Sequence, residues 1–129
     1  MKRVYVAGKY SADNVLDVLK NIGRGEKACA KVFAHGMAPF CPWHDAGFCK
    51  ELTDEEIPKE MYYQNSIAWL EVSDAVYVIS GRGDGGGVDR EIEIAKKIGI
   101  PVFYDFKDLE FWRDWNPYAP KAAQSSLKG

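Results

Sequence analysis

The stretch of residues 73–105 constrains the fold of this chain more than any other part of the sequence. Residues 75–79 (AVYVI) form a short apolar run of β-branched and aromatic side chains, which is typical of a strand buried on both faces. A glycine-rich loop then opens a helix, which Gly99 and Pro101 end just before a second apolar run at 102–104. A strand, a helix and a strand within about 30 residues form a right-handed βαβ unit, so the sheet is predicted to be parallel here.

The helix of this unit carries Glu91, the most informative residue of the chain. Glu91 falls inside the apolar arc of the helix and is predicted to face the sheet, whereas Glu93 is predicted to face solvent. An inward carboxylate is costly unless it is hydrogen-bonded or used in chemistry. The alternative is that Glu91 only bonds free amides near the helix start, where the macrodipole favours negative charge. The arc itself consists of Val88, Ile92, Ile94, Ala95 and Ile98.

Buried-strand candidates alternate with helices along the whole chain. This alternation predicts an α/β fold of three layers, with a four- or five-stranded, mostly parallel sheet. The 129 residues fit a single domain, in which residues 106–129 form an aromatic C-terminal extension. The strands are expected at 4–7, 38–41, 75–79 and 101–105, and further helices at 14–34, with Ser11 or Asp13 as N-cap, at 59–73 and at 106–115.

The composition narrows the classes of function. A formal net charge of −2 without a basic run disfavours binding to nucleic acid polymers and to anionic membranes. The first apolar run is too short for a signal peptide, and no run reaches the roughly 18 residues of a membrane span, so a cytoplasmic protein is expected. Three cysteines at irregular spacing argue against a disulfide framework. Cys41, His44 and Cys49 lack a clear fourth ligand, so neither a metal nor a cofactor is expected.

Three segments that follow predicted strands are expected to meet in one crevice: residues 8–10 (GKY), the loop 43–48, and 80–91. In parallel sheets, ligands bind outside the carboxyl ends of the strands, where the strand order reverses. The connection 43–58 has no clear period and is either a functional lid or a partly helical surface crossover.

Aromatic side chains and glycines supply the candidate binding groups of this crevice. Trp43, His44 and Phe48 would suit stacking against a planar ligand, or they pack on the flank of the domain. Residues 80–88 (SGRGDGGGV) offer backbone amides at a helix N-terminus for a phosphate group or a ribose oxygen. The alternative is a tight turn that needs glycine for its backbone alone. No GKS or GKT follows, which excludes the phosphate loop of nucleoside triphosphatases.

Three segments carry a resemblance to a known family: VYVAG at 4–8, NSIAWLEVSDAVYV at 65–78 and GGGVDREIEIAKKIGIPV at 85–102. In this order they resemble the nucleoside 2-deoxyribosyltransferase superfamily, over about residues 3–105. That superfamily also contains nucleotide N-glycosidases and uncharacterised bacterial and phage proteins. The resemblance implies a flavodoxin-like sheet.

The resemblance also implies roles for single residues. Glu91, within REIEIA, matches the nucleophilic glutamate of the family, and Tyr5 matches the first-strand tyrosine that positions it. Gly87 matches a loop glycine four residues before the nucleophile. The chain departs from the family pattern at Glu93 and Asp89, where the family has glycines, and at Ser66, where it commonly has an aspartate that handles the base. A serine cannot act as a carboxylic acid.

The implied activity is cleavage or transfer at a nucleoside or nucleotide N-glycosidic bond, with Glu91 attacking the anomeric carbon. His44, Asp45 and Glu60 are the candidates for protonating the departing base. The amides of 85–87 and the ammonium group of Lys9 would suit a 5′-phosphate. The alternative is a catalytically silent nucleotide-binding or sensor module. The complete substrate-binding set predicted here is Gly8, Lys9, Trp43, His44, Ser66, Gly85, Gly86 and Gly87.

The C-terminal extension predicts an assembly. Phe111, Trp112, Trp115 and Tyr118 crowd one end of a small domain, and clustered surface aromatic residues often mark an interface. A homodimer is therefore expected. The alternative is that these rings pack on the flank of their own chain.

Overall fold

The computed structural model of this chain describes residues 1–52, 54–80 and 87–115. Within these residues four strands form one sheet: β1 (Arg3–Ala7), β2 (Ala38–Phe40), β3 (Ala75–Val78) and β4 (Val102–Phe103). The longer helices are α1 (Val15–Ala34), α3 (Lys59–Leu70), α4 (Gly87–Ile98) and α5 (Phe106–Asp114). Between β2 and α3 lie a short 3₁₀ helix, η1 (Pro42–Asp45), and α2 (Ala46–Glu51).

The sheet has the strand order β2-β1-β3-β4, and every neighbouring pair is parallel. The register pairs Tyr5 of β1 with Phe40 on one side and with Val76 on the other. The chain runs outward from β1 to β2 and then crosses back to β3, so the strand order reverses between β1 and β3. This arrangement confirms the predicted α/β fold with a parallel, flavodoxin-like sheet.

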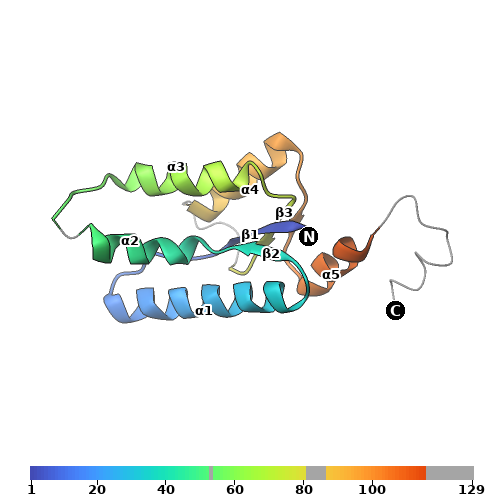
Figure 1. Cartoon of the computed structure of the whole chain (residues 1–129), viewed down its shortest axis with the longest axis horizontal. Coiled ribbons are helices and arrows are strands. Elements are labelled where there is room, and N and C mark those ends of the chain that lie inside the picture. The colour runs from blue at the N-terminus through green and yellow to red at the C-terminus, as the bar shows by residue number, and fades with distance from the viewer. Residues whose placement is uncertain (53, 81–86, 116–129) are drawn as a thin grey trace.

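Helices cover both faces of the sheet, which gives three layers (Figure 1). Alternate residues of β1 serve the two faces, and all of those from Val4 to Ala7 are fully buried. On one face Val4 and Val6 pack in a core with α1 and α5, and on the other Tyr5 and Ala7 pack with α3 and α4. Residues 4–7 of β1 therefore carry no charged side chain, because they meet a helix layer on either side.

Helix α1 begins one residue after Asn14 and runs unbroken through its two glycines. The predicted caps, Ser11 and Asp13, are wrong: Asn14 has an extended backbone, and its side-chain oxygen accepts a hydrogen bond from the Asp17 amide at 2.9 Å. An oxygen at the N-cap reaches the amide three residues later, which only Asn14 does here. The predicted continuity through Gly23 and Gly25 is confirmed.

Helix α5 belongs to the core. Asp105 caps it by accepting a hydrogen bond from the Lys107 amide at 2.7 Å, and the Phe106 and Leu109 side chains are buried against the α1 face. The segment predicted as an extension thus completes one helix layer as far as it is described. No helix of the described chain is both long and apolar enough to cross a membrane.

Candidate functional site

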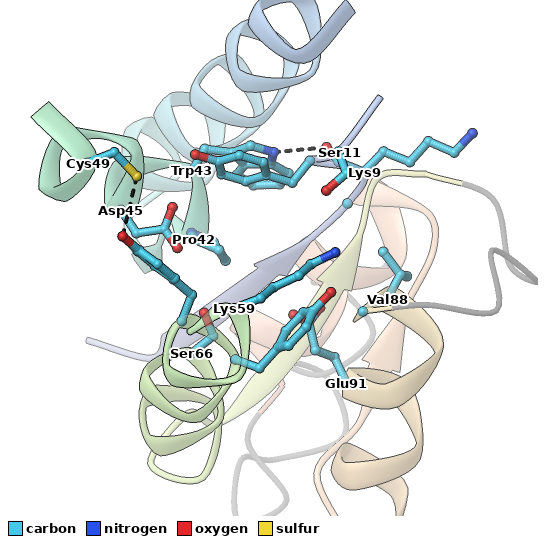
Figure 2. A pocket seen from close by; sticks show the side chains of 15 residues that line it. Lys9, Ser11, Pro42, Trp43, Asp45, Cys49, Lys59, Ser66, Val88 and Glu91 are labelled. Atoms are coloured by element: carbon cyan, nitrogen blue, oxygen red, sulfur yellow. Dashed lines mark hydrogen bonds between the residues drawn. The ribbon is translucent and has the colours of Figure 1, made fainter. Parts of the chain in front are cut away.

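A cavity of about 440 Å³ opens at the carboxyl edge of the sheet, where the strand order reverses. Residues 8–11 after β1, η1 after β2 and the first turns of α4 line it, together with one face of α3 (Figure 2). The predicted meeting of the three segments in one crevice is confirmed for the residues that the structure describes. The ligand site of parallel α/β proteins lies at this same place.

Glu91 lines the cavity, and the buried Tyr5 contacts its carboxylate from the core. The Tyr5 hydroxyl, at the end of a side chain that is 0% exposed, donates a hydrogen bond to Glu91 Oε1 at 2.8 Å. Burial and the Glu91 carboxylate raise the pKa of Tyr5 far above its ordinary value, an effect that the Ser66 hydroxyl partly offsets. Tyr5 therefore stays a neutral hydrogen-bond donor over the whole physiological range of pH. The predicted hydrogen-bond reach between Tyr5 and Glu91 is confirmed.

The arc of α4 places Glu91 as its periodicity predicts. Glu93 is exposed, and Glu91 is half-buried at the edge of the apolar arc, where its side chain opens onto the cavity. Ile98, predicted on the inward arc, is exposed at the last residue of α4, just before Gly99 turns the chain with a positive φ. Val88, Ile92 and Ala95 are buried, and Ile94 packs partly buried against the same core.

Trp43 forms one wall of the cavity. Its side chain is 2% exposed, and its indole N–H donates a hydrogen bond to the Lys9 carbonyl oxygen at 2.9 Å. A Cβ at Gly25 would lie 2.1 Å from the indole ring, and one at Gly8 would lie 2.9 Å from it. The glycines in α1 and after β1 therefore make room for this ring.

The 3₁₀ helix η1 separates Trp43 from His44, which were predicted to line the crevice together. Trp43 lines the cavity and His44 does not. Residues three apart share a face of a 3₁₀ helix, and Pro42 and Asp45 both line the cavity. His44 falls on another face: its side chain is 70% exposed, and its Nε2 lies 3.9 Å from Glu26. The connection predicted as a lid or a crossover is thus a partly helical wall, from which His44 points away.

Asp45 faces a cluster of hydroxyl and thiol groups that the sequence did not single out. Asp45 is half-buried, and burial raises the pKa of its carboxyl group, partly offset by a hydrogen bond from Tyr10. On the facing helices, the Cys49 thiol lies 3.4 Å from the Tyr62 hydroxyl (Figure 2). Tyr62 lies four residues before Ser66 on the same face of α3, a spacing that marks both as neighbours.

Two lysines bring positive charge to the cavity. Lys9 follows β1, and Lys59 begins α3 with its ammonium group 5.7 Å from the centre of the Tyr63 ring. The same ring lies 3.2 Å from the position of a Cβ at Gly87, the first residue of α4. Lys9 and Gly87 therefore line the cavity as predicted. Lys59 also lines it, but nothing in the sequence except its position at the start of α3 indicated this.

The remaining predicted groups lie elsewhere. Glu60 is exposed on α3, where Arg90 at 2.8 Å and then Gln64 lower the pKa of its carboxyl group to about 2. It does not line the cavity. Gly85 and Gly86 lie outside the described residues, so their predicted role stays a prediction.

One of the three cysteines lines the cavity: Cys49, which is exposed on α2. Cys29 and Cys41 are buried in the core on the α1 face of the sheet. Within the described ranges, no group of three or more His, Cys, Asp or Glu side chains is placed to hold a metal ion.

The fold and cavity define a parallel α/β protein of the flavodoxin-like type, with a ligand-sized cavity at its topological switch point. The sequence pattern of a protein family described as a domain of unknown function, DUF7768, matches residues 2–105. The chain belongs to that family. A search of curated proteins found no match. The matched region contains every residue that lines the cavity and ends just before α5.

Proposed function

We propose that this protein cleaves or transfers the N-glycosidic bond of a nucleoside or nucleotide, with Glu91 as the nucleophile. The observation that carries the proposal is the 2.8 Å hydrogen bond from the buried Tyr5 to Oε1 of Glu91, whose carboxylate lines a cavity of about 440 Å³. A buried, neutral phenol fixes one carboxylate oxygen by donating a hydrogen bond, and the carboxylate keeps its negative charge. The resemblance to the nucleoside 2-deoxyribosyltransferase superfamily, which assigns the same two residues, supports it as well.

The chemistry follows from the position of the carboxylate. Glu91 would attack the anomeric carbon of the sugar through an oxocarbenium-like transition state and form a glycosyl ester. Water, or a second base, would then resolve the ester and regenerate Glu91. Tyr5 would hold the carboxylate in orientation through both steps, because its hydrogen bond is made before substrate arrives.

The walls of the cavity suit the parts of such a substrate. The partly exposed rings of Tyr62 and Tyr63 offer flat apolar surfaces for a base and a sugar, while the buried indole of Trp43 closes one wall of the cavity. Lys9 and Lys59 would pair with a 5′-phosphate, which favours a nucleotide over a nucleoside. Nucleotides of the cytoplasm, where we place the protein, are then the natural substrate class.

Base release from a panel of nucleosides and their 5′-monophosphates tests the proposal. Chromatography of the reactions should show a free base for at least one member of the panel. Replacing Glu91 with Gln is expected to lower the rate roughly a thousandfold or more while the dissociation constant of the substrate changes little, because only the nucleophile is lost. Glu93→Gln is the matched control: it is the same change two residues away, on the exposed side of α4. Equal rates in Glu91→Gln and the wild type would remove Glu91 as nucleophile.

A second candidate is a silent nucleotide-binding module. Ser66 is buried beside Tyr5 in the cavity, at the place where the resembling family commonly has a catalytic aspartate. Calorimetric binding of a nucleotide without base release from any member of the panel would favour this second function.

We also propose that two copies of the chain associate through α5. Phe111, Trp112 and Trp115 line a shallow hollow of about 370 Å³ together with Phe103 and Asp108. Trp112 packs against the core on one side of its own chain, while Trp115 is 41% exposed. The exposed part of this aromatic cluster offers an apolar surface to a second copy.

A further inference from the structure

Asp45 is the second carboxyl group of the cavity. Among the described residues that line it, only Asp45 and Glu91 are carboxylic acids. Figure 2 shows Asp45 on the side of η1 and α2, and Glu91 on the side of α4. A ligand that fills the cavity would therefore meet one carboxyl group from each side.

The surroundings of Asp45 favour its acid form. Its side chain is half-buried, and burial raises the pKa of the carboxyl group above its ordinary value. Its charge also contributes to the raised pKa of Tyr5, after burial and the Glu91 carboxylate. The charge of Asp45 is therefore felt at the hydroxyl group that bonds the nucleophile.

The other candidates for a proton donor lie outside the cavity. The imidazole of His44 is mostly exposed next to Glu26, on the outer face of η1. The Glu60 carboxylate is held by Arg90, and this pairing lowers its pKa to about 2, so Glu60 is ionised at neutral pH. Phenol, thiol and ammonium groups are much weaker acids than a carboxylic acid. Asp45 is the group left in reach of a bound base.

We propose that Asp45 is the general acid and base of the site, an inference that rests on the proposed function and deepens it. In the first step a Glu91 oxygen forms a bond to C1′. The bond from C1′ to the base nitrogen breaks, its electron pair goes to the base, and Asp45 gives its proton to the base. In the second step the Asp45 carboxylate takes a proton from water, whose oxygen bonds C1′ while the ester bond to Glu91 breaks. The sum is one water consumed, one free base and one free sugar.

A substrate whose base leaves without being protonated tests the role of Asp45 as general acid separately from its role as base. Guanosine 5′-monophosphate methylated at N7 already carries a positive charge on its base, which departs without protonation. We expect Asp45→Asn to lower the rate of base release in a single turnover about 10²- to 10⁴-fold on the unmethylated nucleotide and less than tenfold on the methylated one, because base release precedes the step in which Asp45 activates water. Glu51→Gln, a carboxyl-to-amide change on the exposed face of α2 outside the cavity, is expected to alter neither rate.

A pH profile gives the second measurement, on whichever nucleotide of the panel is turned over fastest. In the wild type kcat should fall as pH rises through the raised pKa of Asp45, because the acid form is lost. That fall should be missing in Asp45→Asn and return in Asp45→Glu. Among the described residues, the titratable groups that line the cavity with Asp45 are Lys9 and Tyr10 after β1, Cys49 from α2, Lys59, Tyr62 and Tyr63 from α3, and Glu91 from α4. The buried Tyr5 of β1 interacts with Asp45 electrostatically.

The outcomes separate this inference from the proposed function. If Glu91→Gln is inactive but Asp45→Asn keeps its wild-type rate and pH profile, Asp45 is not the acid and the function stands. Equal losses on both nucleotides, with an unchanged pH profile, would also overturn the assignment. Loss of the pH limb in His44→Asn or Glu60→Gln would transfer the role to that residue. A wild-type protein that releases no base from the whole panel would overturn both proposals.

Discussion

The hydroxyl of Tyr5 is the one group whose removal tests the candidate site without disturbing the fold. Tyr5→Phe leaves the buried ring in place and removes the 2.8 Å hydrogen bond to Glu91 together with the interaction of the Tyr5 hydroxyl with Ser66. A hydrogen bond to a charged group is worth about 1.5–3 kcal/mol, so kcat is expected to fall about 10- to 100-fold, with little change in KM. Steady-state base release measures both constants.

The control for Tyr5→Phe is Tyr104→Phe, the same change at a surface tyrosine outside the cavity. It should leave kcat unchanged. Thermal unfolding of both variants should follow the wild type closely, since neither change opens a cavity in the core. A Tyr5→Phe protein with the wild-type kcat would show that Glu91 does not need the hydrogen bond from Tyr5.

Single residues were predictable where the helix period was clear. The 3.6-residue period placed Glu91 inward and Glu93 outward, and the structure agrees. The same reasoning could not choose between His44 and Asp45, because a four-residue 3₁₀ helix has no period long enough to read from sequence. The N-cap of α1 was missed for a similar reason, since Ser11, Asp13 and Asn14 are all suitable cap residues.

At the scale of elements, the packing of α1 against Trp43 predicts that alanine at Gly25 destabilises the protein, whereas helix propensity alone predicts the opposite. Alanine normally stabilises a helix relative to glycine by about 1 kcal/mol. At Gly25, however, the new Cβ would lie 2.1 Å from the Trp43 ring. Overpacking of this kind costs about 1–3 kcal/mol, so Gly25→Ala is expected to lower the free energy of unfolding in urea and to weaken nucleotide binding.

Gly23→Ala is the matched control in the same helix. A Cβ at Gly23 meets no other atom within 4 Å, so the propensity gain of about 1 kcal/mol should appear undiminished. The two variants should therefore shift the urea midpoint in opposite directions. Stabilisation by both changes would mean that Trp43 moves aside without cost.

Strands and long helices were predicted within three residues, because most of their apolar runs are bounded by glycine or proline. The wall formed by η1 and α2 was left open between a lid and a crossover. Its helices hold four and six residues. Elements this short take their structure from what they pack against, here the Trp43 ring fixed to the Lys9 carbonyl oxygen.

At the scale of the whole molecule, the cavity exists because the strand order reverses between β1 and β3. The alternation of strands and helices predicted the parallel sheet, and the sheet placed the crevice. The role of α5 was not predictable in this way. Its aromatic residues indicated an exposed extension, but Phe106 and Leu109 are buried in the α1 face of the core.

The buried part of α5 decides how the predicted homodimer should be tested. Truncation after Asp105 would remove Phe106 and Leu109 from the core, and Leu109 is 0% exposed, so the truncated chain would lose stability as well as any interface. Phe111 and Trp115 are the better targets, because both lie at the rim of the hollow and neither is buried.

Replacing Phe111 and Trp115 with serine together is expected to convert a dimer to a monomer while the far-UV circular dichroism stays that of the wild type. The physical reason is that the apolar surface available to a second copy is lost, whereas Trp112 keeps its contacts with Phe103 and Lys2. Light scattering at several concentrations measures the mass. Phe48→Ser removes an exposed ring from α2 and should leave the mass unchanged. A wild-type chain that scatters as a monomer at all concentrations, or a double variant that stays dimeric, would show that this surface does not join two copies.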